Sequence, residues 1–568
     1  MQFRENFTLI LKTSEAIRYN EPMRLQHRPG IFLFIIYLVW FQACTPLPAA
    51  AAPAFSRASP TAPIQAAQTP PLPSPTSSII SIWLSPSLPG QAREQILHAW
   101  SGLVTSSSSK AQVQVVTGKS HSSSPSQTRV GEWVYALVVP FFQPVLHTTL
   151  DDLQQAWKGK TPAAPLWMTS ETLEIFKTWW GQPAAGMVRV ETAGDLLQKA
   201  WNEKAAWALV PFEQLDPRWR VLRVDGQSPF DPQFSPSTYP LSVPIMATGD
   251  SSASLSLTVK NYDRNHLTVL ALSGVTALAR RTAALMNEKG VLYPAISIDQ
   301  WLQSADLTHI SNEVSFNEAC PPPKAALREA LFCSSPEYIR LLEAVGADII
   351  ELTGNHNLDR GEDAYFYSLE LYRQRGWKTY GGGANLEEAQ RPLFIEHHGN
   401  RLAFLGCNMA GPEIAWAGKE KPGAAPCDFN ALASRVASLR LAGYLPVVTL
   451  QAFETEDYRP APMQQPNSFV RLAEAGAVVI SGSQAHVPQG FQFIGDHYIH
   501  FGLGNLFFDQ TDTPLTRQAT IDRHIFYEGR YLGVELLPIH IVEYGRPVPM
   551  SDDEAQRFLE TLFHASFQ

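Results

Sequence analysis

The chain has 568 residues, with 44 Lys plus Arg against 53 Asp plus Glu, a formal net charge of −9 at pH 7, and 45% hydrophobic residues. This length predicts two or three folded units, and the ordinary apolar fraction excludes wholesale disorder, collagen and coiled coil. An acidic chain without a block of Lys or Arg lacks the charge that supplies most nucleic-acid affinity, so we expect no nucleic-acid partner.

The first 44 residues have the pattern of an export signal. Basic residues precede an apolar run at 31–41, which is too short to span a bilayer, and Cys44 follows a small residue. The signal begins at Met23, so residues 1–22 are interpreted as a mispredicted start. The segment resembles a lipoprotein signal, in which Cys44 is lipidated; the alternatives are a plain signal peptide and an uncleaved anchor. We therefore expect an exported protein attached to the outer face of the cell membrane.

Residues 45–78 are rich in Pro, Ala, Ser and Thr, a composition typical of a solvated linker. The four remaining cysteines form two close-spaced pairs, Cys320 with Cys333 and Cys407 with Cys427. Two local disulfides are the natural pairing in an oxidising compartment, although four cysteines allow three connectivities.

The next region, 79–255, alternates strand-like and helical segments, a pattern that predicts an α/β domain. The predicted strands are 79–84, 113–116, 134–139 and 207–210, and the predicted helices are 91–100, 150–157 and 193–201. The segment 139–159 resembles part of phosphate-type periplasmic binding proteins. The resemblance implies a periplasmic-binding-protein-like domain; the alternative is a degenerate structural module, and no cluster of charged or aromatic residues identifies a ligand.

The informative region, 265–510, places polar residues directly after successive predicted strands. These strands are 266–272, 307–310, 348–352, 445–450 and 477–480. Open α/β sheets place their sites at the carboxyl ends of strands, so we expect one rim to carry Glu313, Asn355, His356, Gln451 and His486. Carboxylate, amide and imidazole groups together suit a divalent metal and general acid–base chemistry.

Two motifs carry a family resemblance. Residues 353–361, TGNHNLDRG, and 502–510, GLGNLFFDQ, resemble signatures of the CapA family of poly-gamma-glutamate capsule biosynthesis proteins, whose fold is similar to that of calcineurin-like metallophosphoesterases. The resemblance implies a four-layer α/β/β/α sandwich, completed by strands and a helix in 511–568. In the related phosphoesterases the Asn of the Asn-His pair binds metal and the His stabilises the transition state, so those roles would pass to Asn355 and His356.

The sequence departs from the family at several of its motifs. Ser273 and Gly274 replace the Gly-Asp that ends the first strand, and the acidic motif Asn-Leu-Glu keeps only Glu313. Residues 451–453, QAF, replace His-Trp-Gly, and 482–486, GSQAH, keeps only the last His of Gly-His-His-Pro-His. Too few ligands remain to predict a two-metal centre.

Two interpretations of the rim stay open. One is a site for a single divalent ion, Mn, Zn or Mg, held by Glu313, Asn355 and His486, with His356 as the catalytic residue. The other is a polar pocket that binds a polyanion or polyamide without metal. Further residues predicted to line the rim are Asn312, Asp359, Gln451, Glu454, Gln484 and Asn505. For Gln451 and Gln484 a structural amide is the alternative, and for Asp359 a loop cap.

Three functions follow from the resemblance and its departures. The first is an exported CapA-like protein in the biosynthesis, export or attachment of an envelope polymer, with an anionic polymer or its synthesis machinery as partner and the membrane reached through a lipid anchor or signal anchor. The second is a metal-dependent phosphoesterase or glutamyl-polymer hydrolase. The third is a noncatalytic ligand-binding lipoprotein of the cell surface.

Overall fold

The computed structural model describes residues 80–118, 127–160, 165–203, 206–252, 255–323, 331–453, 455–460, 468–483 and 485–567. The predictions for the export signal, for Cys44, for the linker 45–78, and for Glu454 and Gln484 lie outside these residues. Within the described part of the chain, no helix is long and apolar enough to cross a membrane.

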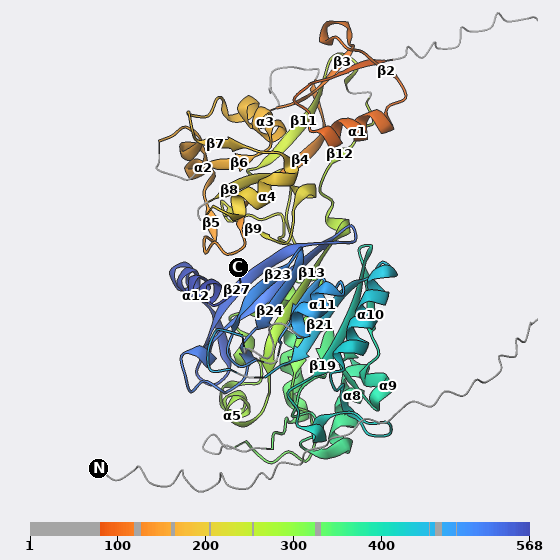
Figure 1. Ribbon diagram of the computed structural model, residues 1–568, viewed down its shortest axis with the longest axis vertical. Coiled ribbons are helices and arrows are strands. Elements are labelled where there is room, and N and C mark those ends of the chain that lie inside the picture. Colours follow the sequence, from red (N-terminus) through yellow and green to blue (C-terminus); the bar gives the residue numbers. More distant parts are fainter. Residues whose placement is uncertain are drawn as a thin grey trace, which may run out of the picture. The chain divides into compact units, whose positions relative to one another are not determined.

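The first region contains a ten-stranded mixed sheet (Figure 1). Its main path runs β2-β1-β3-β11-β4-β8-β6-β7, and both β9 and β12 pair with β4. The strands are β1 (Ser81–Leu84), β2 (Leu103–Val104), β3 (Val113–Thr117), β4 (Gln127–Pro140), β6 (Leu166–Met168), β7 (Val188–Val190), β8 (Trp207–Pro211), β9 (Trp219–Val221), β11 (Ser242–Thr248) and β12 (Val259–Lys260), with a separate pair β5 (His147–Thr148) and β10 (Arg223–Val224).

Four helices connect these strands: α1 (Gly90–Ala99), α2 (Leu150–Trp157), α3 (Ser170–Trp180) and α4 (Ala193–Trp201). The side chains of Thr149, Thr169 and Thr192 accept backbone N–H groups at the starts of α2, α3 and α4. Such caps satisfy donors that the first turn of a helix leaves unpaired. The α/β pattern predicted for this region is confirmed, although α3 was not among the predicted helices.

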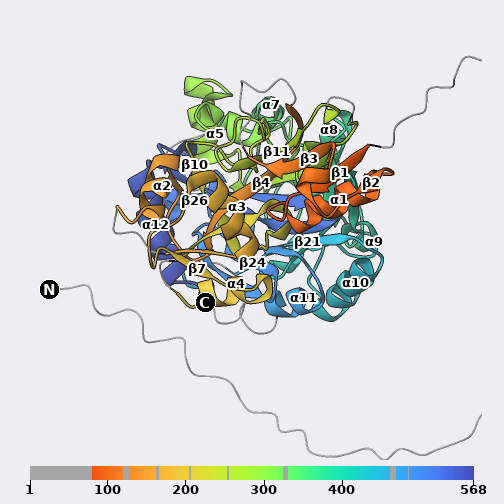
Figure 2. The ribbon, with the colours of Figure 1, turned by 90° about the horizontal axis from the view of Figure 1, so that it is seen from above.

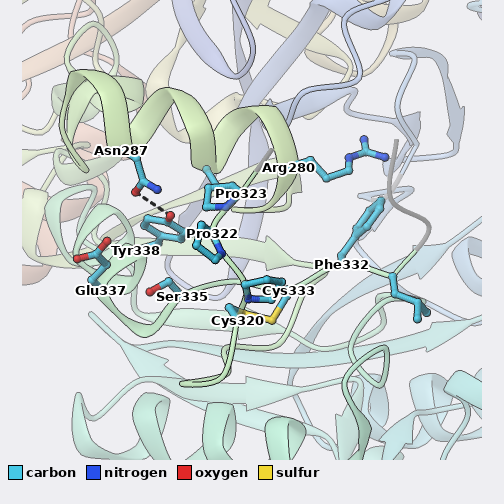
Figure 3. A pocket seen from close by; sticks show the side chains of 13 residues that line it. Arg280, Asn287, Cys320, Pro322, Pro323, Phe332, Cys333, Ser335, Glu337 and Tyr338 are labelled. Carbon is cyan, nitrogen blue, oxygen red and sulfur yellow. Dashed lines mark hydrogen bonds between the residues drawn. A yellow bond between two sulfur atoms is a disulfide. The ribbon is translucent and has the colours of Figure 1, made fainter. Parts of the chain in front are cut away.

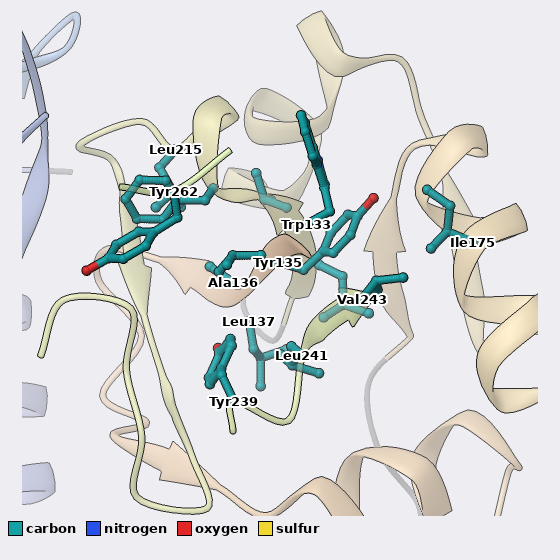
Figure 4. Packing of buried hydrophobic residues seen from close by; sticks show 14 of the residues in the cluster. Trp133, Tyr135, Ala136, Leu137, Ile175, Leu215, Tyr239, Leu241, Val243 and Tyr262 are labelled. Carbon is teal, nitrogen blue, oxygen red and sulfur yellow. The ribbon is translucent and has the colours of Figure 1, made fainter. Parts of the chain in front are cut away.

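The core of the first region is built around β4, whose last eight residues are all buried. Trp133, Tyr135 and Leu137 of this strand pack with Val243 of β11 and with Leu241, which directly precedes β11 (Figure 4). A strand that is buried on both faces needs apolar side chains at successive positions, which explains its continuous hydrophobic run.

The second region contains an eight-stranded and a six-stranded sheet. The eight-stranded sheet runs β16-β15-β14-β13-β26-β27-β28, with β25 paired to β13; the six-stranded sheet runs β18-β19-β21-β22-β24-β23. The strands are β13 (Leu267–Thr276), β14 (Leu307–Asn312), β15 (Ile349–Glu351), β16 (Lys378–Tyr380), β18 (Leu393–His397), β19 (Asn400–Asn408), β21 (Leu445–Gln451), β22 (Val479–Ser481), β23 (Gln489–Ile494), β24 (His497–Gly502), β25 (Asn505–Phe507), β26 (Gln518–Tyr527), β27 (Arg530–Val542) and β28 (Arg546–Pro549), with a small pair β17 (Gly382–Gly383) and β20 (Gly423–Ala424).

The two sheets stack face to face, with helices on their outer surfaces. Leu270 packs in the cluster between the sheets with Phe404 and Val447, whereas its neighbour Ala271 packs in the cluster beneath the outer helices. Figure 2 shows α5, α7 and α8 on one side and α10 and α11 on the other. The helices are α5 (Arg280–Lys289), α6 (Asp299–Gln303), α7 (Ile339–Ala344), α8 (Gly361–Gln374), α9 (Leu386–Ala389), α10 (Phe429–Leu441), α11 (Val470–Glu474) and α12 (Asp552–His564). The predicted four-layer sandwich is confirmed.

Both predicted disulfides are present. Cys320 is bonded to Cys333 and Cys407 to Cys427, with Cα–Cα distances of 5.7 and 5.1 Å. The first closes the loop that follows β14, and the second ties the end of β19 to the segment before α10.

Candidate functional site

Polar side chains from both sheets meet beyond the carboxyl ends of the parallel strands. Glu313 directly follows β14, His356 follows β15, and Gln451 ends β21. The distance from His356 Nε2 to Glu313 Oε1 is 3.5 Å, and Gln451 Nε2 donates to Asn355 Oδ1 at 3.4 Å. The structure thus brings together four of the residues predicted for one rim.

His356 lies between two carboxylates. Its Nδ1 donates to Asp359 Oδ2 at 2.7 Å, because a carboxylate can only accept, so Nε2 is the nitrogen that faces Glu313. Burial lowers the pKa of His356, but the hydrogen bond to Asp359 and the charges of Glu313 and Asp359 outweigh it, and the pKa is raised above its ordinary value. The two carboxylates therefore favour the charged form of the His356 ring.

Aromatic rings and one guanidinium fix the two histidines of the site. Phe332 stacks on His356, with ring centroids 3.9 Å apart, and Phe508 stacks on His486 at 5.0 Å. The guanidinium of Arg280 lies over both phenyl rings, 4.4 Å from the Phe332 centroid and 5.1 Å from that of Phe508. Cation–π contacts of this kind stabilise a positive charge against a ring face.

Arg280, Phe332 and Phe508 were not among the residues predicted for the site. Phe508 lies inside the 502–510 motif, so the motif offered one signal for it. Arg280 follows β13 by a few residues and forms an ion pair with Asp509, which belongs to the same motif. Nothing in the sequence shows that the three side chains stack, because their contacts join segments far apart in the chain.

His486 is oriented by Asn505. Its Nδ1 lies 2.9 Å from Asn505 Oδ1, while Asn505 Nδ2 donates to the carbonyls of Gln510 and Thr516 at 3.2 and 3.0 Å. Because the amide nitrogen is committed to carbonyls, its oxygen accepts, and the His486 proton lies on Nδ1. Asn505 therefore acts as a positioning residue: it holds Nδ1 of His486, so that Nε2 points away from Asn505.

Asn312 has a structural role in this geometry. Its Nδ2 donates to the carbonyl of Val314 at 2.9 Å and to the hydroxyl of Tyr372 at 2.7 Å, and its side chain is fully buried. It ties the end of β14 to α8 and holds Glu313 in place.

Among the described residues of the rim, no three His, Cys, Asp or Glu side chains have ligand atoms within 4.8 Å of one another. In the described part of the chain, one group of such side chains meets this distance limit. It consists of Asp306, which directly precedes β14, with His397 and His398. The side-chain oxygen of Asn355, a predicted metal ligand, accepts a hydrogen bond from Gln451 Nε2. The predicted ion at the rim stays a prediction, and no chemical step is derived through it.

A pocket of about 200 Å³ opens beside the histidine stack (Figure 3). Arg280 and Phe332 line it together with the Cys320–Cys333 disulfide, and Tyr338 donates to Asn287 Oδ1 at 2.8 Å across one wall. The pocket shares Arg280 and Phe332 with the site, and it therefore adjoins His356, on which Phe332 stacks.

Comparisons of the sequence point to proteins of capsule synthesis. The family model described as bacterial capsule synthesis protein PGA_cap matches residues 269–510. The capsule biosynthesis protein CapA of Bacillus anthracis is 23% identical over 299 residues, which cover 52% of this chain and 72% of that protein. The PGA biosynthesis protein CapA of Bacillus subtilis (strain 168) is 24% identical over 239 residues, or 41% and 61% of the two chains.

Solved structures with partial similarity include an ABC-type phosphate transport receptor from Vibrio cholerae, with a TM-score of 0.25 and 16% identity over 30% of this chain and 87% of that one. A putative 5′-nucleotidase from Staphylococcus aureus has a TM-score of 0.31 and 12% identity over 52% and 58% of the two chains. In the sequence match and in the two motifs, residues 269–510 of this chain are thus similar to the bacterial capsule synthesis protein PGA_cap family.

Proposed function

We propose that this chain acts in the biosynthesis of an envelope polymer of the poly-gamma-glutamate type, with the rim around His356 as its working site. The observation that carries the proposal is the family match over 269–510, which contains the residues of the rim. The names of the relatives from Bacillus anthracis and Bacillus subtilis support the polymer class. The match spans 61% of the second relative, so the activity of the whole protein belongs to the proposal.

His356 supplies the chemistry in this proposal. Building or trimming a glutamyl chain requires proton transfer at an amide, and a positioned imidazole contributes typically 10²–10⁴-fold to such steps. Asp359 holds the proton on Nδ1, Glu313 faces Nε2, and Phe332 fixes the plane of the ring. Nε2 is therefore the atom that exchanges a proton with the substrate.

The same geometry supports a second function, cleavage of glutamyl amides in an existing polymer. The observation in its favour is the placement of His356 between two carboxylates, which suits an acid–base residue in hydrolysis as well as in synthesis. The two functions differ in their product, because loss of a hydrolase lengthens the polymer whereas loss of a biosynthetic protein reduces its amount.

Export and membrane attachment complete the proposal. Two disulfides in the described part of the chain support an oxidising compartment, where such bonds persist. The predicted signal and Cys44 supply the route and the anchor, and the polymer or its synthesis machinery is the partner. We expect the mature chain to be attached to the membrane through a lipid on Cys44 and to contain no free thiol. Mass spectrometry of the purified protein would detect both features.

The test is restoration of surface polymer in a poly-gamma-glutamate-producing host that lacks its own relative. We expect the wild-type chain to restore polymer and His356→Gln to reduce it at least about tenfold, because the variant cannot exchange the proton. His98→Gln, which changes an exposed histidine on α1, is the matched control and should equal wild type. Full polymer with His356→Gln would support a noncatalytic role instead. No polymer with folded wild-type chain would overturn the proposal.

A further inference from the structure

A second cluster of titratable side chains lies at the opposite end of β14 from the His356 rim. His397 ends β18, His398 lies in the two-residue turn before β19, and Asp306 directly precedes β14. The two histidines belong to a hairpin of the six-stranded sheet, whereas Asp306 adjoins the first residue of β14 in the eight-stranded sheet. The cluster therefore joins the two sheets.

The protonation of His397 follows from its hydrogen bonds. Thr268 Oγ1 donates to the carbonyl of His397 at 3.0 Å and lies 3.0 Å from His397 Nδ1. The hydroxyl oxygen also accepts from Asn400 Nδ2 at 3.0 Å, and with its own proton on the carbonyl it offers its remaining lone pair to His397 Nδ1. In this arrangement His397 is protonated on Nδ1, and its Nε2 carries a lone pair.

His398 is in the same tautomer for a simpler reason. Its Nδ1 lies 2.7 Å from the carbonyl oxygen of Leu267, which can only accept, so Nδ1 carries the proton and Nε2 the lone pair. His398 has a φ of 48° and Gly399 a φ of 77°, which is the left-handed conformation that a two-residue hairpin turn requires at both central positions.

Asp306 supplies the third group. Its Oδ2 accepts from the backbone N–H of Val269 at 2.8 Å, and its Oδ1 from Arg264 at 2.6 Å. These bonds hold the carboxylate in one orientation but leave it further lone pairs. One ligand atom from each of Asp306, His397 and His398 lies within 4.8 Å of the other two.

We propose that Asp306, His397 and His398 bind a divalent transition metal of the zinc class, at a site separate from the His356 rim. Metal-ligating histidines characteristically donate their other ring N–H to a carbonyl, carboxylate or similar acceptor, which is the pattern of both rings here. Two imidazoles and a carboxylate form a ligand set that zinc accepts, with water completing the tetrahedron.

The surroundings set the strength and the role of this site. Arg264 offsets the charge of Asp306, so the imidazole lone pairs dominate the affinity, and harder ions such as Mg²⁺ and Ca²⁺ are disfavoured. The ligands come from both sheets, so a bound ion stabilises the stacked sheets at the end away from His356. The role is structural, and it does not depend on the proposed function.

The experiment uses the full chain stripped of metal and titrated with zinc chloride, with binding measured calorimetrically and bound zinc measured after gel filtration. We expect one zinc equivalent that raises the thermal midpoint of the wild-type chain. The double variant His397→Gln/His398→Gln should lose that equivalent and its thermal shift. His266→Gln is the matched control, since this nearby exposed histidine pairs with Glu528 and should leave binding unchanged.

A further variant separates this site from the rim. His486→Gln should keep the equivalent, because His486 lies at the other end of the strands. If the double variant folds poorly without metal, the single variant His398→Gln in the exposed turn is used instead. Its affinity for zinc is expected to fall at least tenfold. Zinc binding that is unchanged in the His397 and His398 variants, or lost in His486→Gln alone, would overturn the proposal.

Discussion

At the scale of single residues, a buried carboxylate joins the two loops that carry the histidines of the rim. Glu351 is fully buried and accepts from Thr353 Oγ1 at 2.6 Å and from Ser483 Oγ at 2.5 Å. Thr353 leads into the loop of His356, and Ser483 leads into that of His486. Ser483 also stands where the resembled family has a histidine, so this chain uses the position to fasten a loop.

Removal of this carboxylate should cost stability. In Glu351→Ala two buried hydroxyls lose their acceptor, and each unsatisfied group costs roughly 1–3 kcal/mol, so we expect the free energy of unfolding to fall by about 2–6 kcal/mol. Glu351→Gln should cost less, because an amide oxygen still accepts. Denaturant unfolding measures both. Glu343→Ala, which removes a half-exposed ion pair with Arg375, is the control, and a Glu351→Ala value no larger than the control would refute the expectation.

At the scale of elements, the hairpin of β26 and β27 holds the sandwich together. β26 pairs with β13 from Asp522 to Tyr527 and with β27 along its whole length. Asp522 also accepts from Tyr498 and lies 2.7 Å from His500 Nδ1, and both partners belong to β24 in the other sheet. The hairpin thus supplies a central strand to one sheet and a buried polar contact to the other.

Deletion of this hairpin should abolish folding of the second region, even though the family match ends at residue 510. A chain that stops after Gln510 leaves β13 with an unpaired edge and exposes the apolar face that β26 covers. We expect it to show no cooperative thermal transition by circular dichroism. A chain that stops after Met550 keeps the hairpin and should retain a transition at a lower temperature. Equal midpoints for the 510 truncation and the full chain would contradict this.

At the scale of the whole molecule, the two regions share apolar contacts. Phe141, which follows β4, packs edge-on against Phe491 and Phe493 of β23, with centroids 5.2 and 5.0 Å apart. Arg223 forms ion pairs with Asp231 in its own region and with Glu535 in β27. The domain boundaries predicted near residues 255 and 265 therefore separate strands that belong to different sheets. Side-chain contacts nevertheless continue across these boundaries.

Much of this architecture follows from local patterns in the sequence. The apolar runs at β13, β14 and β21 and the polar residues after them predict a rim at the strand ends, since strand direction fixes where successive loops emerge. The two cysteine pairs are close in sequence, so proximity alone favours their bonds. These features depend on residues near one another in the chain.

Other features depend on contacts that no local pattern encodes. The stacking of Phe332 on His356 and of Phe508 on His486, with Arg280 over both, joins three distant segments. The cluster of Asp306 with His397 and His398 requires the register between two sheets. Asn312, predicted to line the rim, instead bonds Tyr372, because the helix that buries it could not be placed from sequence.

The proposed acid–base role of His356 depends on its two carboxylate neighbours, and titration of the ring itself tests that dependence. The ring signals of His356 in chelator-treated protein, assigned by comparison with His356→Gln, should titrate by NMR with a pKa above the ordinary value of about 6.5, because Asp359 and Glu313 stabilise the charged ring. Asp359→Asn should lower that pKa. A His356 pKa at or below the ordinary value that does not change in Asp359→Asn would contradict this role.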